Sequence, residues 1–423
     1  MRGCDAGQMG NPFDYFLNSR TRPATIAALR GEPLAAALEA YAQHLHEEGY
    51  AVHSGFMQLR LLGCFNKWLF RKGLKRADVD SIIVQQYLRG REQSGRLRSG
   101  DSATMSALLH FLRPGSSAAP SAPVTAVDVA LLQFQDYLRE DRSLAEATVI
   151  NYTPIVRSFL AERFPAGRLR WPQINANDIA VFVRRQAAVV TSKRATVVVS
   201  ALRCFLHYVF HRGVTKVDLA ACVPTIATWS LSNVPKCLPG EQIQKVLDSC
   251  DRKTAIGRRD YAVLLLLARL GLRAGEVVVL RLDDIDWDTG LITVKGKGRR
   301  VVQMPLPAEV GTAIADYLST ARPLCTSRDV FIRATAPLRG FANSVAICSL
   351  VDRALERANV ESKFRGSHLF RHRLASQMLE DDASLLEIGD LLRHRNPDTT
   401  RIYAKVDLAA LRSIALPWPG GNQ

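Results

Sequence analysis

The chain has 423 residues, of which 56 are Lys or Arg and 40 are Asp or Glu, so its formal net charge at pH 7 is +16. Its isoelectric point is near 9.8. This length allows two or three domains with separate cores, and the positive charge favours a polyanionic partner such as nucleic acid. The eight cysteines are scattered without a C-x-x-C pair, so neither a zinc module nor a disulfide framework is indicated.

No stretch of the sequence has the character of a membrane segment. Residues 1–10 lack the apolar core of a signal peptide, and the longest apolar run, residues 262–268, is too short to cross a bilayer. We therefore expect a soluble cytoplasmic protein without a membrane partner.

Residues 1–113 are expected to form a helical N-terminal region. The first 33 residues have no clear periodicity and are expected to be weakly ordered. Apolar residues at helical spacing then predict helices over residues 34–49, 54–71 and 79–91. The helix lengths are similar to those expected in residues 124–223, so a degenerate duplication is one interpretation. The region would then be an additional DNA-binding or protein-binding module.

A linker rich in Pro, Ser and Ala is expected over residues 114–123. A second helical domain follows at residues 124–223, with a further linker over residues 224–237. The helices expected in this domain span residues 129–140, 145–162, 177–185 and 193–211.

Residues 238–423 combine helices with a hairpin. A helix should start at Pro239 and run to about residue 250, and a buried helix is expected over 258–270. Two β-branched runs, 291–294 and 301–304, are joined by a turn rich in Gly, Lys and Arg, which is typical of a β-hairpin. The remainder is expected to be helical up to residue 416. The predicted fold is therefore mostly α with a small β-sheet.

The last sixty residues contain a cationic cluster and a hydroxyl group. His368 and Arg371 are three residues apart, so on a helix they share one face. The planar fork of Arg371 matches two phosphate oxygens. His394 can add another donor, and Tyr403 follows it. A hydroxyl group among cationic donors can attack phosphorus, so this segment predicts a phosphate site with a nucleophile.

This pattern of H-x-x-R, a later His and then a Tyr resembles the tyrosine recombinase (phage integrase) family. Residues 270–277, LGLRAGEV, look like the first catalytic box of that family. In this box Arg273 matches the catalytic arginine and Glu276 the supporting acidic residue. Residues 294–301, VKGKGRRV, look like the family's β-hairpin, and Lys297 falls on its catalytic lysine. Lys295 is a competitor, but its alternating neighbours assign it to the strand.

The resemblance implies a domain organisation. Residues 143–152 look like part of the family's helical core-binding (SAM-like) domain, which would cover residues 124–223 and form half of a clamp around double-stranded DNA. An α/β catalytic domain would cover residues 238–423. Residues 1–113 are an extra helical region by this comparison.

The resemblance also implies a reaction, which is phosphoryl transfer without a metal, ATP or any other cofactor. Arg273, Arg371, His368 and His394 would neutralise the charge that develops on the phosphate oxygens. Tyr403 would be the nucleophile and His368 its proton acceptor. Lys297 would protonate the departing 5′-hydroxyl group, and the product would be a 3′-phosphotyrosyl bond that conserves the energy of the broken linkage.

Three functions are compatible with these residues. The first is a site-specific recombinase or integrase that acts on nucleoid DNA as a homotetramer, with or without accessory or sister recombinases. Its task could be phage integration, transposition, plasmid resolution or chromosome dimer resolution, and we favour integration or transposition of a mobile element. The second is a DNA-relaxing enzyme similar to type IB topoisomerases. The third is a DNA-binding regulator that does not cleave, against which the intact Tyr403 argues.

Two groups of residues mimic metal sites. Asp284, Asp286 and Asp288 resemble the start of a calcium loop, but the glycine is one place late and Lys295 stands where a glutamate is needed. Cys204, His207 and His211 have helical ligand spacing, yet a packed or exposed helix face is the commoner cause of this pattern. We therefore predict no metal site.

Some residues depart from the family pattern. Arg393 and Arg395 flank His394, and Arg373 follows the H-x-x-R motif, where smaller residues are usual. We expect these arginines to add charge at the DNA surface. Residues 407–416 are expected to form a short helix that docks either on its own catalytic domain or on a neighbouring protomer.

Overall fold

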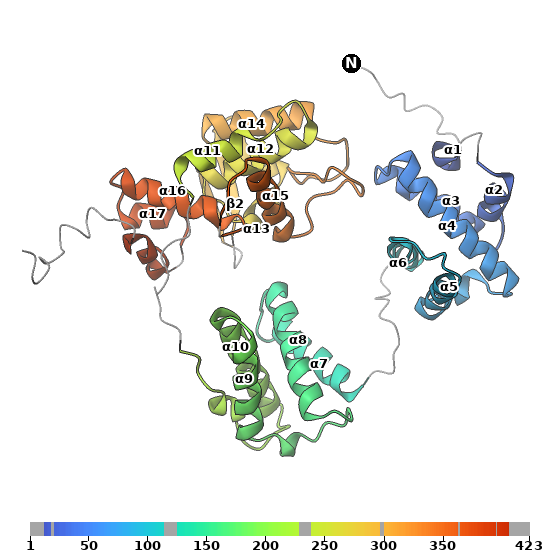
Figure 1. The fold of residues 1–423 in the computed structure, drawn as a ribbon, viewed down its shortest axis with the longest axis horizontal. Helices are drawn as coiled ribbons and strands as arrows, with labels where there is room; N and C mark the ends of the chain where they lie inside the picture. Colours follow the sequence, from blue (N-terminus) through green and yellow to red (C-terminus); the bar gives the residue numbers. More distant parts are fainter. Residues whose placement is uncertain are drawn as a thin grey trace, which may run out of the picture. The chain divides into compact units, whose positions relative to one another are not determined.

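The computed structural model describes residues 12–17, 21–113, 125–227, 238–296, 300–362, 364–394 and 396–405. The chain forms two compact units, one of residues 119–232 and one of the chain on either side of it. The described residues are mostly helical, with one three-stranded sheet (Figure 1), which confirms the predicted fold class. The expected linker at 114–123 and most of the linker at 224–237 lie outside the described residues.

Residues 12–113 form helices around an apolar core of their own. The elements are α1 Pro12–Phe16, α2 Pro23–Arg30, α3 Ala35–Glu47, α4 Val52–Arg71, η1 Arg76–Asp78, α5 Ser81–Gln93 and α6 Asp101–Leu112. The three expected helices are confirmed as α3, α4 and α5, whereas α6 was not predicted.

The expectation of a weakly ordered lead-in is wrong for α1 and α2. Phe13, Phe16 and Leu29 are at most 2% exposed, because they complete the core under α3 and α4. The buried amide of Asn66 on α4 accounts for the end of α2. It donates to the carbonyl oxygens of Ala28 and Gly31, at 2.9 and 2.6 Å. Such long-range contacts leave no local periodicity in the sequence.

Residues 125–227 contain α7 Ala126–Arg139, α8 Glu146–Arg163, η2 Trp171–Gln173, α9 Ala176–Val189, α10 Ser192–His211 and η3 Leu219–Cys222. The four expected helices are confirmed. Thr125 and Asn175 cap α7 and α9 by accepting from the backbone N–H groups of Asp128 and Asp178. Aromatic side chains fill the core between the helices, among them Phe134, Phe159, Phe182 and Phe205.

The C-terminal part contains the sheet and the remaining helices. The helices are α11 Gly240–Asp248, α12 Ala255–Arg269, α13 Ala274–Val278, α14 Ala308–Thr320, α15 Ser344–Arg357, α16 His368–Glu380 and α17 Leu385–Leu391. The 3-10 helices are η4 Leu282–Asp284, η5 Pro397–Thr399 and η6 Arg401–Lys405. Strands β1 Ile285–Asp286, β2 Leu291–Lys295 and β3 Val301–Pro305 form an antiparallel sheet in the order β1-β2-β3.

The expected hairpin is confirmed by the pairing of β2 with β3, in which Ile292 lies opposite Met304. The expectation of continuous helix after the hairpin is wrong for residues 321–343, which are irregular and contain only isolated bridges such as Ile332 with Gly340. The expected helix over 407–416 lies outside the described residues.

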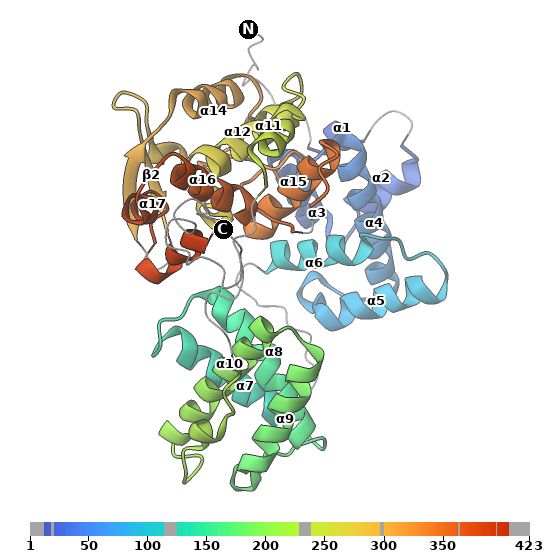
Figure 2. The same ribbon diagram turned by 60° about the vertical axis from the view of Figure 1, so that its left-hand side comes forward.

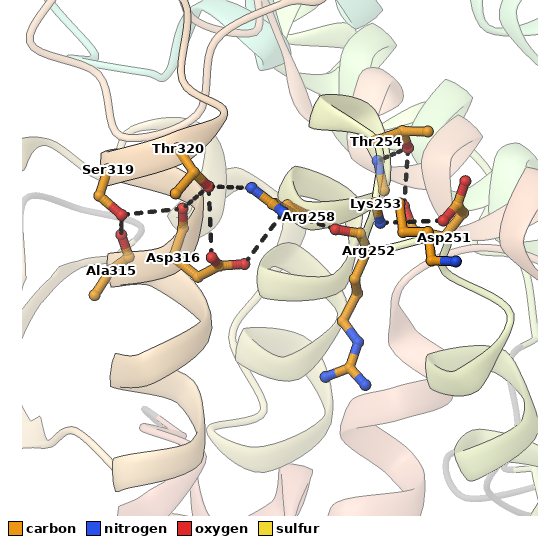
Figure 3. Close-up of polar contacts among 10 residues, drawn as sticks. Asp251, Arg252, Lys253, Thr254, Arg258, Ala315, Asp316, Ser319 and Thr320 are labelled. Atoms are coloured by element: carbon orange, nitrogen blue, oxygen red, sulfur yellow. Dashed lines mark hydrogen bonds and ion pairs between the residues drawn. The ribbon is translucent and has the colours of Figure 1, made fainter. Parts of the chain in front are cut away.

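Helix α12 is the central element of the C-terminal part. Residues 262–267 are fully buried on every side, and each buried leucine side chain contributes about 2 kcal/mol of hydrophobic stabilisation. Thr254 caps the helix by accepting from the Gly257 N–H at 3.0 Å. Arg258 then reaches α14, where it donates to Thr320 and pairs with Asp316 (Figure 3). These contacts fix α12, and the chain leaving its C-terminal end leads directly to Arg273.

Candidate active site

Arg371 on α16 joins two distant segments of the chain. Its side chain is buried, and its two terminal nitrogens donate to the backbone carbonyl oxygens of Gly271 and Leu392. Gly271 has a φ of +56°, and a Cβ atom there would lie 2.7 Å from Leu392 Cδ2, so glycine is required for both backbone conformation and close packing. Arg371 therefore holds the segment before Arg273 beside the segment before His394.

Arg273 and Glu276 form a compact pair at the start of α13. The Glu276 carboxylate accepts from the backbone N–H of Arg273 at 2.9 Å and from its Nη1 at 2.7 Å. Glu276 is 3% exposed while the Arg273 side chain is 34% exposed. The carboxylate thus holds the base of an arginine whose guanidinium remains accessible from outside.

Arg393 reaches the same carboxylate from the other side. Its Nη2 lies 3.0 Å from Glu276 Oε2, and its Nη1 donates to the Leu391 carbonyl oxygen at 2.9 Å. The side chain is only 7% exposed. The expectation that Arg393 adds charge at a DNA surface is therefore wrong, because its charge is buried and paired. Arg373 also forms an ion pair, with Glu380, and Arg395 lies outside the described residues.

Burial and crowding of positive charge lower the pKa of Arg371 to about 9. Burial is the main cause, followed by the nearby charges of Arg273 and Arg393, while Glu276 partly offsets them. Arg371 still carries its charge at neutral pH. Burial alone would raise the pKa of Glu276, but the Arg273 backbone N–H and the charge of Arg393 lower it, so the carboxylate stays ionised.

His394 follows Arg393 and is neutral at neutral pH. Burial lowers its pKa to about 4, and the charges of Arg371 and Arg273 act in the same direction. Its Nδ1 lies 2.7 Å from Thr400 Oγ1, and Thr400 is itself 3% exposed. This contact fixes the orientation of the imidazole ring in a site that already holds several positive charges.

Tyr403 lies in η6, on a small apolar cluster next to the arginines. It is 2% exposed and packs with Ala375, Ile388 and Leu392. Its hydroxyl oxygen lies 2.9 Å from His372 Nδ1, within hydrogen-bond distance. Tyr403 is therefore held at α16, the helix that also carries Arg371. Helices α16 and α17 lie side by side in both views (Figures 1 and 2).

His372 is a site residue that the sequence argument did not name. The sequence pattern indicated His368 as the proton acceptor. His368 is the first residue of α16 and is exposed, and its ring centroid lies 6.3 Å from that of His372. A signal was present, because His372 lies four residues after His368 and so shares its helix face.

Lys297 lies outside the described residues. Lys295, the competing lysine, ends β2, and its Nζ is 2.6 Å from Asp284 Oδ1. A depression of about 660 Å³ lies beside Lys295. Its lining includes Arg273, Glu276, Lys295, Gly296 and Ser344.

The two groups that mimic metal sites have other partners. Asp286 accepts from the backbone N–H groups of Asp288 and Thr289, both at 3.0 Å, and so closes an ordinary turn. His207 Nδ1 lies 3.1 Å from Asp218 Oδ2. Across the part of the chain that the structure describes, no group of three His, Cys, Asp or Glu residues could hold a metal ion. Nor does any helix in that part have the length and apolar character needed to cross a membrane.

Comparisons with known proteins agree with this architecture. Residues 236–409 match the phage integrase family, and residues 131–213 match the N-terminal SAM-like domain of phage integrases. A putative integrase/recombinase of Sinorhizobium fredii, y4rA, is 45% identical over 395 residues, covering 92% of this chain and 96% of the relative. A second protein of that strain, y4rF, is 32% identical over 97% of both chains. The chain therefore belongs to the phage integrase family, the tyrosine recombinases, which cleave and rejoin DNA.

More distant relatives are also named recombinases or integrases. The tyrosine recombinase XerD of Listeria innocua is 28% identical over 66% of this chain and 95% of its own. Among solved structures, the XerH recombinase in a post-cleavage complex with a palindromic difH substrate covers 78% of this chain and 93% of its own, with 16% identity and a TM-score of 0.54. A lambda integrase dimer bound to a core site covers 70% and 99%, with 15% identity and a TM-score of 0.51. The likeness to both structures is one of fold.

Proposed function

We propose that this protein is a site-specific recombinase in which Tyr403 attacks a DNA phosphate held by Arg273 and Arg371. The observation that carries the proposal is the position of Arg371. Its hydrogen bonds to Gly271 and Leu392 bring the segments of Arg273 and His394 to the helix against which Tyr403 packs. Residues far apart in the sequence thus meet at one place, as a phosphoryl-transfer site requires.

The electrostatics of the cluster suit a phosphate in its transition state. Arg273, Arg371 and Arg393 carry three positive charges against the one negative charge of Glu276, so a net charge of about +2 remains to stabilise a pentacoordinate phosphorane. Neutral His394 can still donate. With Nδ1 accepting the Thr400 hydroxyl proton, Nε2 carries the proton toward a phosphate oxygen. We propose His368, at the start of α16, as a further donor to the same phosphate.

Tyr403 must lose its proton to become a nucleophile, and His372 Nδ1 lies within hydrogen-bond distance of its hydroxyl oxygen. The distance of 2.9 Å between their polar atoms allows direct transfer. We assign His372 this role, with His368 beside it. Lys297, which the sequence places between β2 and β3, is the candidate acid for the departing 5′-hydroxyl group. The phosphotyrosyl bond then preserves the energy needed for rejoining.

We further propose that double-stranded DNA of the nucleoid is the partner and that a homotetramer on two synapsed sites is the active assembly. The charge of +16 supports a DNA partner, and XerH and lambda integrase are seen with their DNA sites. We also propose that the protein serves a mobile element, with residues 1–113 as an additional module and residues 124–223 as the core-binding domain. The names of the two Sinorhizobium fredii relatives, integrase/recombinase, support this role.

A test should distinguish a recombinase from a DNA-relaxing enzyme with the same residues. A cognate duplex is first selected by binding from a randomised library and placed on two plasmids. We expect wild-type protein to join the two plasmids, and the Tyr403→Phe variant to bind the duplex without joining them. Relaxation of a supercoiled plasmid without any joined product would favour the topoisomerase-like alternative. Binding without relaxation or joining would favour a non-cleaving regulator.

A further inference from the structure

Arg393 has an unusual backbone conformation. Its φ of +55° lies in the left-handed region, which costs an L-residue roughly 1–2 kcal/mol and favours glycine. A long side chain persists in such a position when its own contacts compensate for the strain. The contacts of the Arg393 guanidinium therefore indicate its role.

Those contacts connect three elements. Nη2 lies 3.0 Å from Glu276 Oε2 of α13, and Nη1 lies 3.2 Å from Met304 Sδ of β3 and 2.9 Å from the Leu391 carbonyl oxygen at the end of α17. Arg393 and Glu276 are separated by 117 positions in the sequence. The pair thus links the segment that carries His394 to the helix that begins beside Arg273.

The oxygens of Glu276 are divided between the two arginines. Oε1 accepts from Arg273 Nη1, while Oε2 accepts from the Arg273 backbone N–H and from Arg393 Nη2. Because the carboxylate is buried, its rotation would leave at least one donor without a partner. Arg393 therefore restricts the orientation of Glu276, and Glu276 in turn restricts the guanidinium of Arg273.

We propose that Arg393 is a positioning residue: it fixes Glu276, and through it the guanidinium of Arg273, in the orientation needed to bind the scissile phosphate. It does this together with Arg371, which joins the same two segments through Gly271 and Leu392. Its charge also keeps Glu276 from cancelling the whole charge of Arg273. This inference rests on the proposed function, since Arg273 must act on a phosphate.

The test compares wild-type protein with Arg393 variants. The rate measured is the single-turnover formation of the covalent protein–DNA adduct on a nicked form of the selected duplex. Arg393→Met should slow the adduct about tenfold or more while changing the Kd for DNA less than about threefold, because the preorganisation and not the binding surface is lost. Arg393→Lys should recover part of the rate. Arg393→Gly tests the same loss on a backbone that glycine prefers, so backbone strain at this position cannot account for the result, and thermal melting of each variant checks that it is folded. Arg328→Met, which removes an exposed arginine paired with Asp283, is the control and should keep the wild-type rate.

A double-mutant cycle with Glu276→Gln tests the route of the effect. If Arg393 acts through Glu276, the double variant should be no slower than the slower single variant, within about twofold.

Two results would overturn the inference. These are a wild-type rate in both Arg393→Met and Arg393→Gly, and rate losses that multiply in the double variant. Each presumes that wild-type protein forms the adduct. A wild-type protein that forms none would instead contradict the proposed function.

Discussion

The C-terminal part and the central helical unit use ion pairs in different ways. In the central unit, Arg139 of α7 pairs with Glu146 of α8 through a fork of two hydrogen bonds, with 40% and 58% of the side chains exposed. In the C-terminal part, Arg393 and Glu276 pair at 3.0 Å with 7% and 3% exposed. The shortest N–O distances are similar, 2.8 Å in the exposed pair and 3.0 Å in the buried one, whereas the exposure to water differs greatly.

That difference decides what each pair does. An exposed pair contributes about 0–1 kcal/mol, because water and salt screen it. A buried pair adds little net stability over an apolar one, yet removing one partner costs about 3–5 kcal/mol, because the other charge is left alone. The burial of these arginines is therefore better explained by the orientation and charge that they give the site than by a gain in stability. Substitutions in the two kinds of ion pair test this contrast.

The largest effect is expected from Arg371→Ala. The variant loses a transition-state donor and frees the carbonyl groups of Gly271 and Leu392, so adduct formation should fall by about a hundredfold or more. Arg371→Lys should restore little, because one ammonium group cannot reach both carbonyls and a phosphate. Single-turnover cleavage of the selected duplex measures both. A loss below about fivefold in Arg371→Ala would remove Arg371 from the centre of the site.

A smaller loss is expected from His372→Phe, which keeps a ring in the site but removes the base beside Tyr403. Cleavage should slow by about tenfold to a hundredfold, and the loss should shrink at high pH, where the phenol ionises without help. DNA binding serves as the control measurement and should be unchanged. Equal losses at pH 7 and pH 9 would assign His372 a purely structural role.

Stability should depend on pH through His394. Its pKa is about 4 in the folded protein and near 6.5 when unfolded, so the unfolded state binds more protons between these values. Stability is therefore complete above about pH 6.5 and is lost as the pH falls toward 4. Thermal melting should record this loss, and His394→Gln should reduce it. The same slope in both proteins would mean that other groups, such as Glu276, account for the whole acid sensitivity.

The smallest effect is expected for the exposed pair. Arg139→Met should leave the midpoint of urea denaturation and the rate of cleavage of a bound duplex near their wild-type values, because water and salt screen this exposed pair. Urea denaturation of the full chain gives the midpoint. A fall in the midpoint as large as that of Arg393→Met would erase the contrast between the two kinds of ion pair.

The sequence predicted what local patterns encode. Apolar periodicity identified α4 and α10, and alternating β-branched runs identified β2 and β3. It missed α1 and α2, because their burial depends on contacts such as Asn66 with Ala28, far apart in the chain. It also assigned helix to residues 321–343, where isolated bridges and turns hold the chain.

For the candidate site too, the sequence predicted what local motifs encode and missed what depends on long-range contacts. The motifs named Arg273, Glu276, Arg371, His394 and Tyr403, whose described side chains gather around α16 and the start of α13. They did not indicate His372, since it lies just after the H-x-x-R pattern, which ends at Arg371. Nor did they indicate the buried role of Arg393, which depends on a left-handed backbone and a partner 117 positions away. No local pattern carries that information.

The central claim is that Tyr403 attacks the phosphate, and peptide mapping of the trapped adduct tests it most directly. Wild-type protein is trapped on a nicked suicide form of the selected duplex, digested with protease and nuclease, and sequenced by mass spectrometry. We predict a nucleotide attached at its 3′-phosphate to the peptide that contains Tyr403, and no adduct from Tyr403→Phe. A nucleotide on any other residue, or an undiminished adduct from Tyr403→Phe, would contradict the account.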